Sequence, residues 1–360
     1  MKRNGAQRII EGICCTLRAA FGLLLTAAVI ASPFWLTEDS PEQLLERAAQ
    51  LYRSFRASES TAISGGVVAG EVVTPTEVTV TAPPATTTTT AAPTTTTSTE
   101  GLLPVREVQY LKGNVSGSGI NVKNGNSNHS IDIAAQLAKQ PDFRLSSEGY
   151  QVLIIHTHTT ECYTGNGSGF YNPKVSPRTT DKSQNIVRVG DEVEQELDAA
   201  GIKVLHVTTV HDYPAYNGSY GRAQDTINEY LKKYPTIQMV IDIHRDAMTQ
   251  NDGTKLKPTA VINGRKAAQV MIISGCNDDG SLYFPDWEYN LRMAVRLQKQ
   301  LCEDWPGLAR PLYFAPFRYN MHLTRNSLLI EFGTDANSLD EAIYSGELFG
   351  KSLAKLLKSL

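Results

Sequence analysis

QVLIIHTHTTE, residues 151–161, joins a short apolar run to a polar turn that carries two histidines and a glutamate. The run Gln151–Ile155 is apolar after its first residue and is bounded by polar residues, which predicts a buried strand. The arrangement recurs in MVIDIHRDA over 239–247 and in SLLIEFGTDAN over 327–337. Each of the three segments therefore ends a predicted strand with imidazole or carboxylate groups.

Apolar runs alternate with helical patterns throughout residues 105–360. The predicted strands are Gln151–Ile155, Lys203–Val207, Met239–Asp242, Val270–Ser274, Leu312–Ala315 and Ser327–Phe332, and the predicted helices are Ser183–Ala200, Gly221–Lys233, Trp287–Cys302 and Leu339–Ser359. Such alternation predicts an α/β fold with a mostly parallel central sheet flanked by helices. Because functional groups gather beyond the carboxyl ends of such strands, we expect the three polar segments at one edge of the sheet.

The side chains at these strand ends match the ligands of a catalytic zinc, which is commonly held by two histidines and one carboxylate with water at the open position. His156 or His158, together with Glu161 and His244, supplies that set. A separate carboxylate is needed to take a proton from the water and hand it to the leaving amine, and Glu331 is the candidate.

Two choices stay open from the residues alone. His156 and His158 would face the same way on an extended backbone, but a turn begins here, so either is a candidate ligand. Arg245, next to His244, either binds the carboxylates of a peptide substrate or forms an ion pair within the domain. The segment HDYPAYNGSYGRA over 211–223 either lines a groove for sugar or peptide, or forms a turn packed on the core.

The composition argues against nucleic acid as a partner and against sites built from cysteines. The 34 Lys and Arg residues nearly balance 37 Asp and Glu residues and form no basic block, so nucleic acid is not an expected partner. The five cysteines show no CxxC spacing, which argues against a disulfide framework or a cysteine-rich zinc site.

The N-terminal region predicts export. Residues 19–36, AAFGLLLTAAVIASPFWL, carry no charge and follow a basic stretch over 1–18. A helix of about 18 residues rises about 27 Å, close to the thickness of a bilayer core. We therefore predict a cytoplasmic segment at 1–18 and a single-pass anchor at 19–36, with the rest of the chain outside the membrane. A cleaved signal peptide ending near Ala31 is the alternative, and it also exports the rest.

Residues 37–104 include a Thr/Pro-rich run with little to bury. Such a run cannot offset the entropy cost of ordering its backbone, so we predict a disordered linker. The catalytic domain is predicted to cover residues 105–360.

Several motifs in order resemble the stage II sporulation protein P family: HTHTTECY, NIVRVGDEVEQELDAAGIKVLH, HDYPAYNGSY, IDIHRDA and LLIEFGTDANS. The resemblance implies a fold similar to the zinc-dependent N-acetylmuramoyl-L-alanine amidases. By matching motifs, His244 resembles the later histidine ligand and Glu331 the catalytic glutamate. The first ligand corresponds to His158 or to His156.

The carboxylate ligand has two candidates under this resemblance. Glu161 belongs to the family's own motif, whereas the corresponding glutamate of those amidases usually opens the next helix. The segment TDKSQN opens that helix here, so Asp181 is a rival.

The resemblance further implies a membrane-anchored enzyme of the sporulation septum that removes stem peptides from peptidoglycan during engulfment. The family acts as amidase and also as endopeptidase, together with stage II sporulation proteins D and M. Two other hypotheses remain: a non-catalytic module that binds peptidoglycan or organises septal partners, and a metal-dependent esterase or deacetylase acting on polysaccharide.

Overall fold

The structure, a computed structural model, describes residues 101–360. The anchor predicted at 19–36 and nearly all of the linker predicted at 37–104 lie outside the described residues. Within 101–360, no helix is both long enough and apolar enough to cross a membrane.

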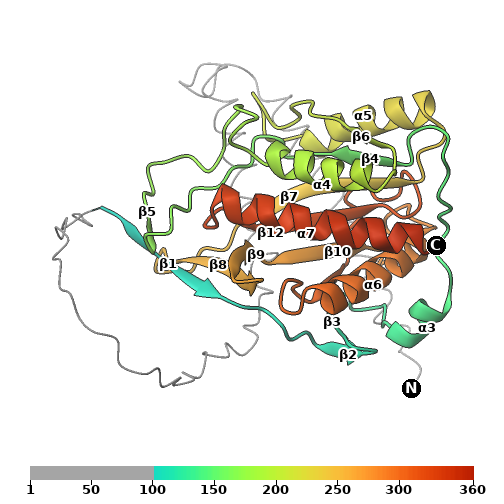
Figure 1. The fold of residues 1–360 in the computed structure, drawn as a ribbon, viewed down its shortest axis with the longest axis horizontal. Helices are drawn as coiled ribbons and strands as arrows, with labels where there is room; N and C mark the ends of the chain where they lie inside the picture. Colours follow the sequence, from blue (N-terminus) through green and yellow to red (C-terminus); the bar gives the residue numbers. More distant parts are fainter. Residues whose placement is uncertain (1–100) are drawn as a thin grey trace, which may run out of the picture. The chain divides into compact units, whose positions relative to one another are not determined.

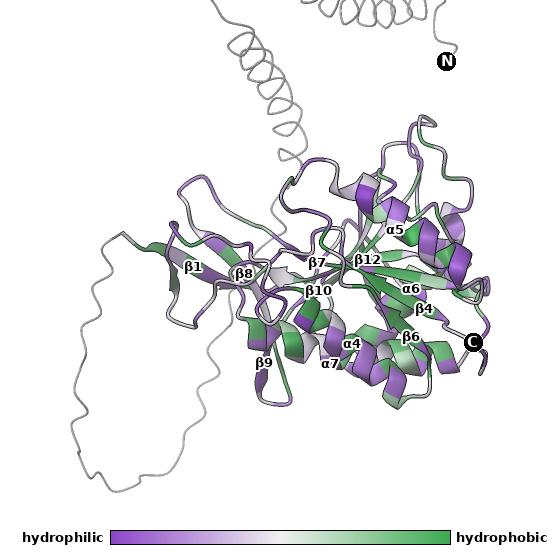
Figure 2. Cartoon of the chain, turned by 90° about the horizontal axis from the view of Figure 1, so that it is seen from above, coloured by the Kyte–Doolittle hydropathy of each residue, from purple (hydrophilic) through white to green (hydrophobic). Residues whose placement is uncertain are grey.

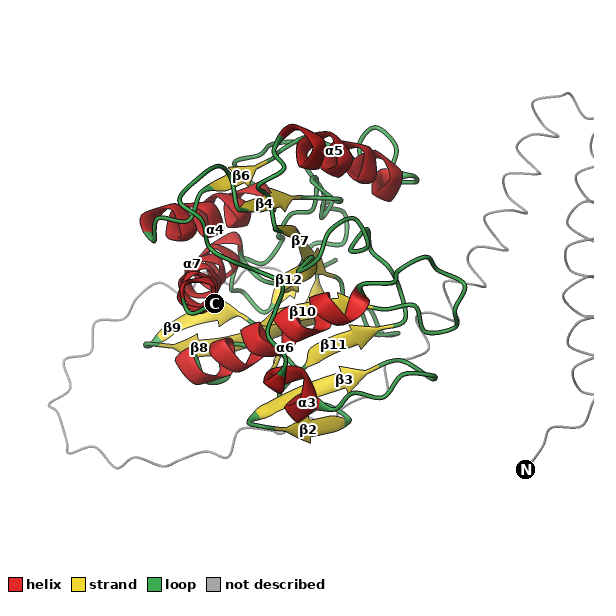
Figure 3. Cartoon of the chain, turned by 90° about the vertical axis from the view of Figure 1, so that its right-hand side faces the viewer, coloured by secondary structure: helices red, strands yellow, loops and turns green. Residues whose placement is uncertain are grey.

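The central element is an eight-stranded sheet with the strand order β2-β3-β11-β10-β12-β7-β4-β6 (Figure 3). Its strands are β2 (Val115–Gly117), β3 (Ile120–Asn124), β4 (Val152–Ile155), β6 (Val204–His206), β7 (Met239–Asp246), β10 (Val270–Gly275), β11 (Leu312–Ala315) and β12 (Leu328–Thr334). All six predicted strands are present, and β2 and β3 were not predicted.

The central sheet is mixed: five of its seven strand pairs are parallel, in line with the predicted mostly parallel sheet, and two are antiparallel. Strands β12, β7, β4 and β6 run parallel to one another, but β10 runs antiparallel to β12, and β2 antiparallel to β3. Parallel neighbours need a crossover, usually a helix, that carries the chain back to the starting end. The chain between β7 and β10 forms strands and no helix, so β10 enters the sheet in the opposite direction.

A second, four-stranded sheet has the order β5-β1-β8-β9. It contains β1 (Leu103–Val108), β5 (Phe170–Tyr171), β8 (Lys255–Ile262) and β9 (Arg265–Ala268). None of these strands was predicted. Strand β1 contains Pro104 and β8 contains Pro258. Proline has no backbone N–H to donate to a neighbouring strand, so a sequence that contains it is rarely predicted as a strand.

Helices cover both faces of the central sheet (Figures 1 and 3). The short helix α3 (Ile133–Ala138) lies between β3 and β4 in the chain. The four long helices are α4 (Val187–Ala199), α5 (Ser219–Lys233), α6 (Trp287–Asp304) and α7 (Leu339–Lys358). The four predicted helices are confirmed. Helix α7 begins with a capping box in which Ser338 and Glu341 each bond the other's backbone N–H.

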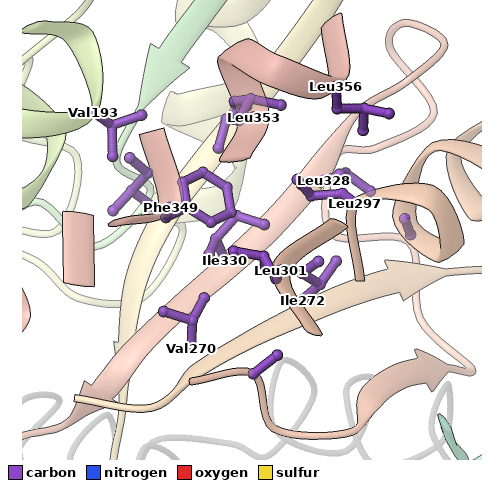
Figure 4. Close-up of a cluster of buried hydrophobic side chains, with 14 of the residues drawn as sticks. Val193, Val270, Ile272, Leu297, Leu301, Leu328, Ile330, Phe349, Leu353 and Leu356 are labelled. Atoms are coloured by element: carbon purple, nitrogen blue, oxygen red, sulfur yellow. The ribbon is translucent and has the colours of Figure 1, made fainter. Parts of the chain in front are cut away.

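The main core lies between the sheet and helices α4, α6 and α7, where Val193, Leu297 and Phe349 pack against Ile272 and Ile330 (Figure 4). Helix α5 covers the other face, where it packs on Leu153, Ile155 and Val240. Figure 2 shows the apolar strands between helices whose outer sides are hydrophilic.

Side-chain alternation decides where the polar residues of β7 lie. Ile241 and Ile243 point into the main core. Because successive side chains of a strand point to opposite faces, Asp242 and His244 lie on the α5 side with Val240. The chemistry-bearing residues therefore share the face that α5 covers only in part.

A charged contact joins the ends of α6 and α7. Asp304 accepts hydrogen bonds from Lys355 Nζ at 2.5 Å and Ser352 Oγ at 2.7 Å. Burial opposes ionisation of Asp304, but these donors hold its pKa below the usual value. A carboxyl group whose pKa is lower in the folded than in the unfolded state stabilises the fold at every pH above its pKa in the unfolded state. This stabilisation is lost as the pH falls through its pKa in the folded state.

We therefore expect Asp304→Asn to lower the free energy of unfolding by about 1 kcal/mol at neutral pH, since the exposed lysine is screened by solvent. The difference between the variant and the parent should shrink as pH falls below about 4. Urea denaturation across this pH range measures it. A difference that stays constant with pH would show that the carboxylate charge is not its source.

Candidate active site

Three neighbouring parallel strands bring the three polar segments to one edge of the sheet. Ile155 of β4 pairs with Asp242 of β7, and His244 of β7 pairs with Glu331 of β12. Paired residues on adjacent strands project from the same face, so His244 and Glu331 lie side by side. The expectation that these segments meet is confirmed.

His158, Glu161 and His244 form a buried group. The rings of His158 and His244 meet edge to face, with centroids 5.2 Å apart. His244 Nδ1 lies 3.5 Å from Glu161 Oε2. Two imidazoles from different strand ends thus lie near one carboxylate, and these residue types suit zinc.

Surrounding groups hold Glu161 and His244 in place. The backbone N–H of Arg245 donates to Glu161 Oε2 at 3.1 Å. On the far side of the His244 ring, Asp242 Oδ1 lies 2.9 Å from Nε2, and Asp242 itself accepts from Thr157 N–H at 2.8 Å and from the Thr157 hydroxyl at 2.6 Å. A carboxylate behind a histidine is the usual support for a metal-binding imidazole.

Two buried side-chain atoms at the site have no regular hydrogen bond. Neither His244 Nε2 nor Glu331 Oε2 has a hydrogen-bond partner, although both atoms are buried. The Asp242 oxygen lies close enough to His244 Nε2 for an ion pair, but the two atoms do not form a regular hydrogen bond. Such buried polar atoms are costly unless something compensates for them.

The electrostatics of the group also favour a cation. Burial and the neighbouring His244 lower the pKa of His158 to about 4, which keeps its imidazole neutral and able to bind metal. Burial works against charge on His244, yet Asp242 and Glu161 raise its pKa well above the usual value. Against burial, His244 and Arg245 hold the pKa of Glu161 at about 2. Two carboxylates therefore face the His244 ring, where a metal would replace its proton.

Glu331 has the properties of a general base. Its side chain is partly exposed, but Oε2 is buried. Burial and the charge of Asp246 raise the pKa of Glu331 to about 8. A carboxyl group whose pKa lies near the operating pH both accepts and returns a proton efficiently.

The structure does not bring His156 to this group. Its Nδ1 donates to Ile243 O at 3.0 Å, and its Nε2 lies 2.8 Å from His206 Nε2, on the side of the sheet that α4 covers. The physical reason is that β4 ends at Ile155 and a turn follows, so strand alternation does not carry over to His158.

Asp181 also lies elsewhere. It is exposed and accepts hydrogen bonds from the N–H and hydroxyl of Ser183 in a local turn. Of the alternatives left open by the sequence, the structure places His158 and Glu161 beside His244.

Arg245 is not at the surface, where substrate binding would need it. Alternation along β7 turns its side chain away from the face of His244. It is buried, with Nε donating to Cys162 O at 3.0 Å and Nη2 to Pro177 O at 2.7 Å. The side chain thus joins β7 to the loop after β4.

We expect Arg245→Met to lower the free energy of unfolding by about 2 to 3 kcal/mol, because two backbone carbonyls lose a charged donor. Chemical denaturation measures the loss. Arg245→Lys keeps the charge but not the planar guanidinium, so its free energy of unfolding should lie between those of the parent and of Arg245→Met. Unchanged stability with weakened substrate binding would instead support the substrate-binding prediction.

The segment 211–223, whose role the sequence leaves open, lies against His158. Tyr216 stacks on the His158 ring at 4.6 Å, with its hydroxyl 3.2 Å from Nε2. Ser219 Oγ lies 3.3 Å from Nδ1, and the Tyr220 ring meets His158 edge-on at 5.6 Å. Tyrosines thus form a wall of the site.

Arg178 was not predicted at all. Its Nη1 donates to Asp212 Oδ2 at 2.6 Å, its Nη2 lies 3.5 Å from Glu161 Oε1, and its guanidinium lies over the Tyr216 ring. About one third of its side chain is exposed, at 33%. It is the cation beside the site that solvent can reach, and no sequence motif marks it.

A cavity of about 220 Å³ lies away from this group. It is bordered by β1, β8, the 165–170 loop and Ala336.

Comparison with known proteins identifies the family. The family model described as "Stage II sporulation protein P (SpoIIP)" matches residues 84–354. Stage II sporulation protein P of Bacillus subtilis (strain 168) is 28% identical over 214 residues, which are 56% of this chain and 50% of that protein. The chain therefore matches half the length of this relative.

Solved structures with some likeness include two amidases. The CwlD amidase from Clostridioides difficile, in complex with the GerS lipoprotein, is 11% identical with a TM-score of 0.38, covering 58% of this chain and 100% of that one. The N-acetylmuramoyl-L-alanine amidase AmiC2 of Nostoc punctiforme is 12% identical with a TM-score of 0.34, covering 60% and 97%. TM-scores this low do not assign a fold.

The match to the family model spans all three polar segments that meet at the sheet edge. It also covers nearly all of the described residues. The chain belongs to the stage II sporulation protein P family.

Proposed function

We propose that this protein is a peptidoglycan hydrolase that cleaves the amide bond between N-acetylmuramic acid and the L-alanine of the stem peptide. The observation that carries the proposal is the convergence of His158, Glu161 and His244 beside Glu331 on one face of the sheet. Membership of the family supports a role in sporulation.

The residues present fit a zinc ion held by His158, Glu161 and His244, because neutral imidazole and carboxylate ligands suit this metal. When bound, zinc supplies Lewis acidity toward the amide carbonyl and the attacking water. Asp242, behind the His244 ring, would hold that imidazole in orientation.

Glu331 handles the proton of the reaction. Its carboxylate takes a proton from the attacking water as the water oxygen bonds to the carbonyl carbon. When the carbon–nitrogen bond breaks, Glu331 returns that proton to the amine of L-alanine, so that atoms and charge balance. The pKa of about 8 that burial gives this group suits both halves of the transfer.

Two groups beside the site are suited to hold substrate. The partly exposed guanidinium of Arg178 can pair with a carboxylate of a stem peptide. The half-exposed ring of Tyr216, at 52%, offers a flat apolar surface beside it.

We further propose that residues 19–36 anchor the protein in the membrane of the sporulation septum, with the catalytic part outside the cytoplasm. Endopeptidase activity on the stem peptide and cooperation with stage II sporulation proteins D and M belong to the same proposal. It is supported by the N-terminal sequence and by family membership.

The test is to incubate the purified full chain with peptidoglycan, with and without chelator and added zinc, and to identify the released fragments by mass spectrometry. The proposal expects free stem peptides with an L-alanine amine, lost on chelation and restored by zinc. Released acetate with intact stems would identify a deacetylase. Binding of peptidoglycan without any release, in the presence of zinc and septal partners, would identify a non-catalytic module.

A further inference from the structure

We propose a second divalent-cation site, for zinc or an ion of similar chemistry, formed by His206 Nδ1 and the carboxylates of Asp191 and Glu194. It lies on the opposite face of the central sheet from the candidate active site. His206 pairs with Ile154 of β4, whose side chain points into the core under α4, so the His206 ring faces α4 as well.

Three ligand atoms converge at this place. His206 Nδ1 lies 3.3 Å from Asp191 Oδ1 and 3.3 Å from Glu194 Oε2, and all three atoms are within 4.8 Å of one another. Asp191 and Glu194 stand three residues apart on α4, which puts them on one side of the helix. The imidazole is buried, with 3% of its side chain exposed, whereas the carboxylates are 40% and 34% exposed. A cation can therefore enter from solvent.

The hydrogen bonds behind His206 determine which atom it presents. Ile243 O can only accept, so His156 Nδ1 carries a hydrogen and donates to it. His156 is fully buried, and its ring nitrogens contact Ile243 O and His206 with no carboxylate among them, so the ring is neutral and its Nε2 accepts. His206 Nε2, at 2.8 Å, must then be the donor.

This chain of bonds leaves His206 Nδ1 aimed at two carboxylates. A neutral ring would present a lone pair to two negative groups, which requires a positive charge between them. That charge is either a proton on Nδ1 or a metal ion.

The distances are compatible with a metal. A protonated imidazole bonded to a carboxylate lies about 2.7 to 2.9 Å from its oxygen. Two ligands each about 2.1 Å from a tetrahedral zinc are roughly 3.4 Å apart. Both observed distances, 3.3 Å, fit ligand atoms around a metal, and they are also the length of a loose ion pair such as Arg325 Nε–Asp286 Oδ2 at 3.3 Å. The donation from His206 Nε2 to a second group is also the usual support of a metal-binding histidine.

One cation already lies close by. Arg188 Nη1 donates to Asp191 Oδ2 at 2.6 Å, but this is not the oxygen that faces His206. Arg188 therefore reduces the affinity for a divalent ion without occupying its place.

The site would stabilise the turn that carries the active-site ligands. The backbone carbonyl of His156 accepts from the Thr159 hydroxyl at 2.9 Å and from His211 Nδ1 at 2.8 Å. His156 thus connects His206 to the first residues of the HTHTTE turn. Holding β6 to α4 through a metal would restrain that turn from behind.

The test measures metal content of the full chain after stripping with chelator, reloading with zinc and removing free metal. In a His158→Ala/His244→Ala background, which lacks the active-site ligands, we expect about one zinc ion per chain to remain. Adding Asp191→Asn and Glu194→Gln should remove it. Glu192→Gln, which removes a carboxylate of the same helix outside the group, is the matched control and should retain it. Arg188→Gln should tighten zinc binding.

Retention of zinc in the background variant and its loss with the two carboxylates supports the site. A folded background variant that binds no zinc, with His206 protonated by NMR, would overturn it in favour of a simple ion pair. If the wild-type chain binds zinc only at the second site, the proposed amidase site fails while this inference stands, so the two outcomes are separable.

Discussion

Glu331→Gln should slow release of stem peptides from peptidoglycan by about 10²- to 10⁴-fold, the usual contribution of a general acid–base. Glutamine has nearly the shape of glutamate but cannot take a proton from water. The variant should keep its fold and its zinc, because Glu331 lies beside His244 without belonging to the proposed ligand set. Single-turnover rates on purified peptidoglycan, with metal content measured on the same sample, give both quantities.

A neighbouring carboxylate supplies the control for this experiment. Asp246 also lies near Glu331 and pairs with Arg310 Nη1 at 2.9 Å. Asp246→Asn also removes a carboxyl group beside the site but no proton acceptor of the proposed reaction, so its effect on rate should be much smaller. Equal losses in both variants, or loss of zinc from Glu331→Gln, would show that Glu331 acts through charge or metal binding.

His158→Ala should abolish activity and release the active-site zinc, whereas His156→Ala should not remove that zinc directly. His158 faces His244 and Glu161, but His156 is engaged with Ile243 O and His206. Removing His156 leaves a cavity and breaks two buried hydrogen bonds, so the cost should appear as about 2 to 4 kcal/mol of stability.

Metal content after dialysis and urea denaturation of both variants separate the two effects. The pair is matched because both residues are buried histidines of the same turn, two positions apart. Loss of active-site zinc from His156→Ala at a temperature where the variant is folded would contradict this assignment. Retention of that zinc in His158→Ala would do the same.

The strand ends that carry the site were predictable because their patterns are local. The apolar runs before His158, His244 and Glu331 are each bounded by polar residues, and each forms a strand of the central sheet. The unbroken apolar character of these runs predicts burial on both faces and hence parallel neighbours. Strands β4, β7 and β12 are indeed parallel, so the three segments meet.

The direction of β10 was not predictable from its own residues. Its apolar run looks like the others, but its direction depends on the chain between β7 and β10, which forms strands with prolines and charges. The second sheet was missed for the same reason, because pairing between distant segments stabilises strands that local composition disfavours.

The residue types of the site, their order and their attachment to strand ends follow from the sequence by itself, as does the family. Only the tertiary structure shows that His158 and Glu161 lie beside His244, whereas His156 and Asp181 lie elsewhere, and that Arg245 points inward. It also placed Tyr216 and Arg178 at the site. Local patterns specify strands through a period of two, whereas a side chain in a turn points where its contacts with other segments direct it. Those contacts join residues up to about 90 positions apart in the chain, so no short stretch of sequence contains them.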